Sequence, residues 1–523
     1  MDGKSVVVWA NASRGCRNNS LNFCATPPAS NSSRCQTAPK RPAASDTNPG
    51  PNLPGQMVFT CLSHDVVAHE MTHALVHRLR RYFLEPTNVD VLAFHEAFAD
   101  IVALFQRFSY RDILRAHIQA SRGRLHGESM LVDLAQQVGY ASGTGQALRS
   151  ALGQKADPTL LARVHEPHRR GAILVSAVFD GFFRTYERRI EDLIRIATGG
   201  TGELPRGHLH PDLVNRVAQE ASLLADHVLR MCIRAFDYLP PVDVTFGDFL
   251  RALVTADLEL NPDDPYELRF SIIESFRARG IYPQEVLSLA EESLVWPSTV
   301  STKELPKLPK PLLMNMQTLF ALNARALDWT GRVVERKEIA AYQTFQRSVV
   351  ESDEVETEEA DEKALDSERG LRSRIYAELT NYGSDKKNAA ALGFNPRATI
   401  AVSGFHPVHR IGIDQRLLVE MIVQFVQTDD TRKEEFGGIP MRAGATVIFG
   451  ADGTARYVIA KPMPFKKQTA ECAKLAKARE ERQTRFVEQT DLADPRLAWG
   501  DDQYRRQRME LRKSLAALHS GIL

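Results

Sequence analysis

The segment 63–100 constrains the fold more than any other part of the chain, because it combines a metal-ligand motif with two helical patterns. Residues 69–73 read H-E-M-T-H, an H-E-x-x-H motif, and the apolar residues around it recur at helical spacing. Side chains four apart on a helix face the same way, so His69 and His73 can bind one metal ion. Glu70 is rotated to one side, where a carboxylate can take a proton from a metal-bound water.

Two histidines leave a metal site incomplete, so a third ligand must come from elsewhere. A longer motif with a histidine ten residues after His69 is excluded, because Leu79 stands there. His77 continues the ladder, but the helical rise places it about 12 Å from His69. Glu96 and Asp100 lie four apart on a second predicted helix. Glu96 can complete a site of two histidines and one glutamate, and Asp100 can hold a ligand histidine through its other ring nitrogen.

The two segments resemble the thermolysin-like zinc metallopeptidases of the gluzincin clan. Residues 65–75, DVVAHEMTHAL, are similar to the family pattern D-V-V-x-H-E-x-T-H-A, and residues 96–101, EAFADI, are similar to its N-E-A-x-x-D-I pattern. The resemblance assigns a role to each residue at a matching motif position. It implies one Zn²⁺ held by His69, His73 and Glu96, with Glu70 as general base and Asp100 as the partner of a ligand histidine.

Two further positions bear on metal binding. His95 stands where the family usually has Asn, so it is an alternative third ligand to Glu96. Asp65 lies where the family often has a calcium ligand, but a carboxylate is also favourable at a helix N-terminus. No companion set of acidic ligands accompanies Asp65 in the sequence, so Ca²⁺ is a second cofactor without support.

The resemblance also implies a histidine that stabilises the oxyanion of the tetrahedral intermediate. The family places it just before a glycine and a helix of the second lobe. In this chain, residues 164–171 read VHEPHRRG and precede an apolar helical stretch. We predict that His168 is this catalytic donor, and His165 is the alternative.

The parts of the family fold that hold the substrate are only weakly represented. Residues 9–12, WANA, are faintly similar to an Asn-Ala motif of the family's substrate-binding edge strand, but the leader around them is rich in Ser, Asn and Pro. The substrate cleft is therefore incomplete, or this end of the chain is altered relative to the family. The family also has a Tyr shortly before its Glu ligand. Thr87 occupies about that place and Tyr82 lies nearby, so the second oxyanion donor is not identified.

Composition limits the class of protein. The chain has 523 residues, of which 43% are hydrophobic and 25% charged, as in soluble globular proteins with several domains. A formal net charge of +1 argues against a nucleic acid bound by bulk electrostatics. No apolar run approaches the roughly 18 residues of a spanning helix, and the apolar stretch near the start is too short for a secretory signal. We therefore predict a cytoplasmic location with no membrane and no nucleic-acid partner, and the oligomeric state stays open.

The predicted fold class is mainly α, and α+β overall. It consists of a gluzincin-like zinc-helix core with a helical lobe, a small C-terminal β-rich domain and a disordered N-terminal leader. Helical periodicity continues to about residue 297, whereas 388–465 alternates like strands, with Asp452-Gly453 as a hairpin signal. The predicted parts are a disordered or altered leader at 1–55, a mostly helical peptidase region at 56–297, a linker with an acidic helical segment at 298–385, a β-rich domain at 386–465 and a charged helical tail at 466–523.

Some helix ends can be predicted from the residues. Pro86 is expected to end the first metal-binding helix, and Asn88 or Asp90 to cap the second. Pro265 is expected to begin a later helix that ends before Gly280.

Taken together, the motifs predict a zinc metalloendopeptidase that hydrolyses a peptide or protein substrate with a metal-activated water. One alternative is an aminopeptidase of the same clan, but the Gly-x-Met-Glu-Asn motif that holds a substrate amine in those enzymes does not occur. The other is a catalytically inert scaffold that keeps a structural zinc site and binds another protein.

Overall fold

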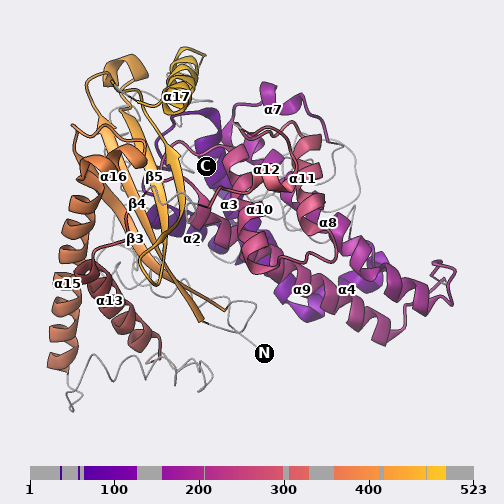
Figure 1. Cartoon of the computed structure of the whole chain (residues 1–523). Coiled ribbons are helices and arrows are strands. Elements are labelled where there is room, and N and C mark those ends of the chain that lie inside the picture. The colour runs from indigo at the N-terminus through magenta and orange to yellow at the C-terminus, as the bar shows by residue number, and fades with distance from the viewer. Residues whose placement is uncertain are drawn as a thin grey trace.

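A computed structural model of the chain describes residues 36–37, 57–58, 64–125, 156–298 except 205 and 285, 305–328, and 358–489 except 412–416 and 467. This part of the chain is mainly helical and contains one four-stranded antiparallel sheet (Figure 1). The mainly helical class and the small C-terminal sheet are thereby confirmed. Of the predicted leader, only one strand of a short antiparallel pair, β1 (Gln36–Thr37) with β2 (Met57–Val58), is described.

A lobe of packed helices carries the H-E-x-x-H motif and extends to residue 294. Its longer helices begin with α2 and α3, which bear the motif residues, and continue through α8 to α11, which form the bundle predicted for this region. The helices are α2 (His64–Leu79), α3 (Val89–Gln106), η3 (Arg107–Ser109), α4 (Arg111–Ser121), α7 (Leu160–Arg163), α8 (Pro167–Ala197), α9 (Pro211–Ala235), η4 (Phe236–Tyr238), α10 (Phe246–Leu260), α11 (Leu268–Ala278) and α12 (Glu291–Leu294).

Helix α2 ends at Leu79, seven residues before the predicted stop at Pro86. The carbonyl of Leu79 accepts hydrogen bonds from Nη1 of Arg80 and from Nε2 of Gln424, both at 3.1 Å. These bonds satisfy an end carbonyl that the helix cannot pair by itself. The second helix begins as predicted, because the Asn88 side chain accepts from the Asp90 backbone N–H at 2.7 Å.

The predicted start of α11 at Pro265 is also wrong. Pro265 lies in a turn, and the helix begins at Leu268. The Asp264 carboxylate accepts from the backbone N–H groups of Leu268 and Arg269 at 2.8 and 2.9 Å, and so caps the helix in place of a local N-cap side chain. The predicted end holds, since Gly280 has φ +72 just past the helix.

The sheet is a meander of four strands that follow one another in the order β3-β4-β5-β6. The Asp452-Gly453 hairpin signal is confirmed, because Gly453 has φ +77 in the turn between β5 and β6. The strands and the helices that accompany them are α13 (Lys310–Asp328), α15 (Glu358–Ser384), α16 (Lys386–Ala391), β3 (Ile400–Ile411), β4 (Leu417–Asp429), η5 (Lys433–Phe436), β5 (Met441–Gly450), β6 (Ala455–Lys461) and α17 (Ala470–Gln489).

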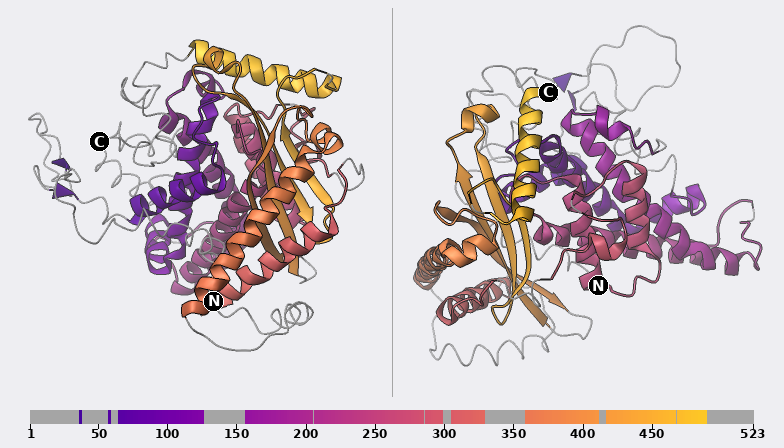
Figure 2. Two further views of the ribbon diagram at one scale, coloured as in Figure 1. Left: turned by 90° about the vertical axis from the view of Figure 1, so that its left-hand side faces the viewer. Right: turned by 45° about the horizontal axis from the view of Figure 1, so that its top comes forward.

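The sheet lies between two helical layers. Figures 1 and 2 show α13 and α15 crossing one face, while the lobe that contains α2 and α3 lies against the other. Alternate residues of β4 explain this arrangement: Ile422 belongs to the core of the helical lobe, whereas Val423 and Phe425 belong to the core beneath α13 and α15. The period of two buries both faces of the sheet.

Polar contacts also join the sheet to the helical lobe. The buried Glu420 of β4 forms ion pairs with Arg234 of α9 and Arg456 of β6. Arg442 of β5 donates to the Glu85 carboxylate at 2.7 Å, in the connection between α2 and α3. The predicted β-rich region therefore supports the two motif helices directly.

The predicted charged tail contains α17, and this helix packs on the body of the protein. Arg479 donates to Lys461 O at 2.9 Å and to Asp243 Oδ2 at 2.8 Å. Of the linker with an acidic helical segment predicted at 298–385, the structure describes residue 298, residues 305–328 and the part from residue 358, where α15 begins. None of the helices that the structure describes is long and apolar enough to cross a membrane.

Candidate metal centre

Helices α2 and α3 bring the three predicted ligands together. The Nε2 atoms of His69 and His73 lie 2.9 Å apart, and each lies 3.6 Å from Oε2 of Glu96. All three ligand atoms lie within 4.8 Å of one another. Within the described ranges, this is the single cluster of three or more side chains that can hold a metal ion.

The chemistry of these side chains fits a divalent cation. Glu96 is 1% exposed, and neither of its carboxylate oxygens accepts a hydrogen bond in the structure. An ionised carboxylate is costly to bury unless a charge compensates it. Two imidazole nitrogens and one carboxylate oxygen are a ligand set that suits zinc, with room for a water in the fourth position.

Each histidine of the trio is held through its second ring nitrogen. His69 Nδ1 lies 2.9 Å from Asp100 Oδ1, and His73 Nδ1 lies 2.5 Å from Nδ1 of His95. Such contacts fix the tautomer and the orientation of a ligand ring. Asp100 therefore occupies the place that the sequence predicts for it.

His95 does not take the place of Glu96 among the ligands. Its fully buried ring stacks on His73, with the ring centroids 4.7 Å apart, and its Nδ1 faces the nitrogen of His73 that points away from the carboxylate. His95 is thus a support for His73. This contact was missed from the sequence, although the position of His95 directly before Glu96 on α3 offered a signal.

Glu70 is half buried beside the trio. Burial raises the pKa of its carboxyl, and the neighbouring His69 and His73 partly offset that rise. A carboxylate with a raised pKa accepts and returns a proton more readily near neutral pH. Glu70 therefore combines partial burial beside the cluster with a raised pKa, two properties that a proton-accepting carboxylate would need.

His168 lies at the carboxylate of Glu96, although it comes much later in the sequence and belongs to another helix. Its Nε2 is 3.3 Å from Glu96 Oε2. It belongs to the first turn of α8, where Pro167 takes the first position and Glu166 is the N-cap. The Glu166 carboxylate accepts from the His168 backbone N–H at 3.1 Å and lies 2.9 Å from its Nδ1.

The carboxylates around His168 favour its charged form. Burial disfavours the imidazolium, but the charges of Glu96 and Glu166 outweigh burial and raise the pKa of His168 to about 9. Burial likewise disfavours charge on Glu96, yet His73 and His168 lower the pKa of that carboxyl well below its ordinary value. The neighbouring charges therefore favour an ionised carboxylate at Glu96 and a protonated, hydrogen-bond-donating imidazole at His168.

Other residues named from the sequence lie outside this cluster. His165 is exposed and has no contact with Glu96. Thr87 donates to Asp243 Oδ1 at 2.7 Å. The Cζ atom of Arg442 lies over the Tyr82 ring, 4.5 Å from the centroid of that ring. Asp65 accepts from Arg107 Nε at 2.5 Å, so its charge serves an ion pair in place of a calcium site. Residues 9–12 lie outside the described part of the chain.

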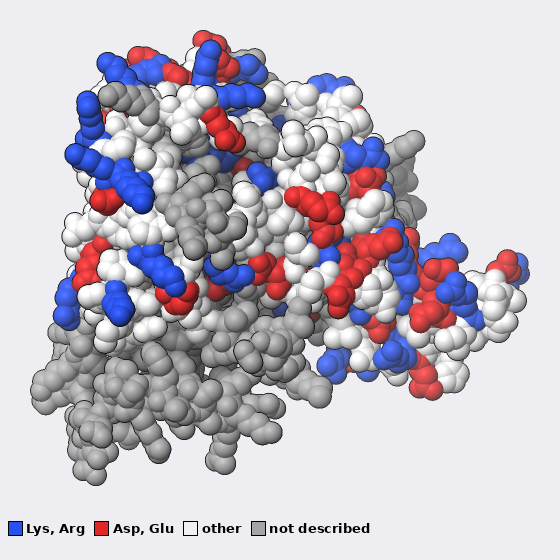
Figure 3. All heavy atoms as spheres, viewed as in Figure 1, with Lys and Arg blue, Asp and Glu red and all other residues white. Residues whose placement is uncertain are grey.

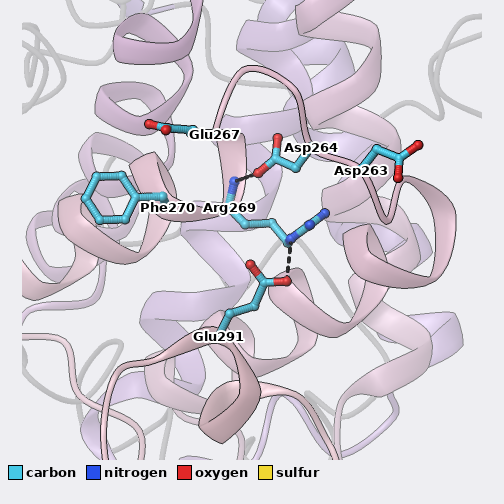
Figure 4. A pocket seen from close by; sticks show the side chains of 6 residues that line it. All are labelled: Asp263, Asp264, Glu267, Arg269, Phe270 and Glu291. Atoms are coloured by element: carbon cyan, nitrogen blue, oxygen red, sulfur yellow. Dashed lines mark hydrogen bonds and ion pairs between the residues drawn. The ribbon is translucent and has the colours of Figure 1, made fainter.

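A separate hollow on the surface lies far from this chemistry in sequence. Figure 4 shows it between the turn before α11 and α12, lined by Asp263, Asp264, Glu267, Arg269, Phe270 and Glu291. Three of its carboxylates have protein partners, since Asp264 caps α11, Glu291 accepts from Arg269 Nε at 2.8 Å and Glu267 pairs with Arg188 at 3.0 Å. On the face drawn in Figure 3, acidic and basic side chains are interspersed over the described surface.

The geometry thus joins six residues that the sequence predicts as a site, from three helices: His69, Glu70, His73, Glu96, Asp100 and His168. No family model, curated protein or solved structure was found to match this chain.

Proposed function

We propose that the protein is a zinc-dependent metalloendopeptidase. The observation that carries the proposal is the convergence on one buried carboxylate, Glu96, of two imidazoles from α2 and a third from α8. If these histidines were ordinary surface residues of α2, the burial of the Glu96 carboxylate between them, without hydrogen bonds, would be unexplained. A metal site with a donor beside it accounts for all four side chains.

His69, His73 and Glu96 would hold the ion. When bound, zinc lowers the pKa of a coordinated water toward neutrality and polarises the carbonyl of the scissile bond. Asp100 and His95 keep the two ligand imidazoles in the tautomer that leaves Nε2 free to bind.

The remaining steps belong to side chains of this chain. Glu70 accepts the proton of the attacking water and passes it to the nitrogen of the leaving amine. His168, in its charged form, donates a hydrogen bond to the oxyanion that develops on the attacked carbonyl. Glu166 keeps the His168 ring turned toward the site through its contact with Nδ1.

One observation favours the second candidate, an inert scaffold with a structural zinc. Two residues could replace the family's tyrosine, and both are engaged elsewhere. Arg442 of β5 lies over the Tyr82 ring, and Thr87 donates to Asp243, which precedes α10. The connecting segment therefore supplies no second oxyanion donor from these positions.

Glu70→Gln separates the two candidates, because it removes the base and leaves the ligands in place. For the peptidase, the purified full chain binds one zinc and cleaves casein or a mixed peptide library, and the variant keeps the zinc while losing most of its hydrolysis. Glu203, an exposed carboxylate beyond the C-terminal end of α8, gives the matched control variant Glu203→Gln. A zinc-loaded wild type that cleaves nothing supports the scaffold instead.

A further inference from the structure

The first turn of α8 crosses α3 next to Glu96 with almost no space between the helices. A Cβ atom at Gly171 would lie 2.8 Å from Ala93 O and 3.2 Å from Ala97 N. A larger residue at this crossing would push the two helices apart. The distance of His168 from Glu96 is therefore set in part by how α8 sits on α3.

A buried arginine, two residues after His168, connects this crossing to its surroundings. The Arg170 side chain donates to Asp90 Oδ1 at 2.6 Å, to Leu161 O at 2.5 Å and to Val164 O at 2.8 Å. Asp90 is in the first turn of α3, and its other oxygen accepts from the Phe246 backbone N–H at 3.0 Å. One guanidinium thus links α3, the segment before α8 and, through Asp90, the start of α10.

These contacts lie on both sides of the turn that presents His168. Leu161 and Val164 precede that turn, and Asp90 belongs to the helix that bears Glu96. We propose that Arg170, through its pair with Asp90, is a positioning residue that holds His168 at the metal centre. This inference rests on the proposed function, since it assigns Arg170 a part in the stabilisation of the oxyanion.

The residue type at this position supports the role. An arginine presents several N–H donors in a planar arrangement and can bind one carboxylate and two carbonyls at once. A pair needed only to neutralise Asp90 would not require the two bonds to the backbone before α8. Those bonds fix the path of the chain that leads to Glu166 and His168.

A double-mutant cycle on peptide hydrolysis tests the proposal with Arg170→Met, His168→Ala and the double variant. A misplacement of about 1 Å at a reacting group can cost about 100-fold in rate. We therefore expect Arg170→Met to lower kcat by about 10- to 100-fold, with KM and zinc content within about twofold of the wild type. In the His168→Ala background the same change is expected to lower kcat by less than about twofold, because the two residues act as one unit.

Arg279→Met is the matched control. Arg279 is also buried and also pairs with a carboxylate of α8, Asp180 at 3.1 Å, but it lies far along that helix from His168. Both arginine variants are expected to lower thermal stability, and Arg170→Met alone is expected to lower kcat at a temperature where both are folded. Equal losses of kcat in the two variants, or a loss from Arg170→Met that is the same with and without His168, would overturn the proposal.

A second variant and a structural measurement cover the remaining outcomes. If Arg170→Met does not fold, Arg170→Lys keeps a positive charge toward Asp90 without the planar donor set, and the same cycle is run with it. If the wild type binds zinc but hydrolyses nothing, the proposed function fails, while crystal structures of the wild type and the variant still decide this inference. A His168 ring that moves about 1 Å or more from Glu96 in the variant supports it, and an unmoved ring overturns it.

Discussion

The Nδ1 atoms of His73 and His95 lie 2.5 Å apart in the buried contact between α2 and α3. Only one of the two nitrogens can carry the shared proton. Burial and the nearby His73 lower the pKa of His95 well below its ordinary value, so its ring is neutral. If His73 binds metal through Nε2, the proton sits on Nδ1 of His73, and His95 is the acceptor.

Substitution of His95 should therefore change metal affinity without removing a ligand. We expect His95→Leu to weaken zinc binding by about 10- to 100-fold, because it removes the acceptor that fixes the His73 ring. His95→Asn supplies an acceptor oxygen and should retain most of the affinity. Competition with a chromogenic chelator measures both, and an unchanged affinity in His95→Leu would contradict the assigned role.

The proposed ligand set excludes His77, which follows His69 and His73 on α2. Replacement of His69 by Ala should abolish stoichiometric zinc binding, because two protein ligands remain. His77→Ala should keep one zinc per chain, since His77 is not a member of the cluster. Metal analysis of dialysed protein gives the result, and a loss of zinc from His77→Ala would mean that the ligand set is wrong.

Asp243 should make the stability of the fold depend on pH. Burial opposes its ionisation, but Arg482, Arg479 and Lys461 lower the pKa of its carboxyl far below the ordinary value. A carboxyl whose pKa is lower in the folded state stabilises the fold fully above its unfolded pKa of about 3.9, and this stabilisation is lost as the pH falls below that value. Asp243→Asn should thus lower the free energy of unfolding by about 3–5 kcal/mol at pH 7.

The difference between wild type and Asp243→Asn should shrink below about pH 4, because the aspartate of the unfolded chain then takes up a proton while that of the folded protein stays ionised. Urea unfolding at pH 7, 5 and 3 follows both proteins. Asp226→Asn is the control, because Asp226 pairs with Arg230 at the surface of α9 and its loss should change stability by no more than about 0.5 kcal/mol. A constant difference between wild type and Asp243→Asn across this pH range would contradict the prediction.

A shortened chain of residues 56–297 should not form a stable metal centre. The sheet contributes four side chains to the core of the helical lobe, Ile422, Ile448, Tyr457 and Ile459. Each buried side chain of this size stabilises the fold by about 1.5–3 kcal/mol. We expect the fragment to show a weak or absent unfolding transition and less than one bound zinc, whereas residues 56–490 behave like the full chain. A fragment that folds cooperatively and binds zinc would show that the sheet is dispensable.

The sequence predicted structure correctly where residues close in sequence favour one backbone conformation. The spacing of His69 and His73 requires a helix if both are to bind one ion, and Asp452-Gly453 favours a tight turn between strands. Glu96 and Asp100 followed from the same periodicity on α3. These features depend on neighbours within a few residues, and the structure contains the helices and the turn.

Features that depend on distant partners could not be predicted. The end of α2 at Leu79 is satisfied by Gln424, which is 345 residues away in sequence. Likewise, the sheet has apolar residues on both faces. The sequence of β4 does not indicate that Ile422 packs on the helical lobe and Val423 packs beneath α13 and α15. The contact of His95 with His73 depends in the same way on how α3 packs against α2, which the sequence of either helix does not specify.

The contacts of Arg442 and Arg479 have a consequence for the order in which the protein is made. Arg442 pairs with Glu85 across 357 positions of sequence, and Arg479 pairs with Asp243 across 236. During synthesis the helices with the histidines leave the ribosome long before these arginines are translated. A nascent chain therefore carries the H-E-x-x-H motif for several hundred residues of synthesis without the arginines that support its helices, so the proposed hydrolytic competence should arise only after Arg479 has been translated.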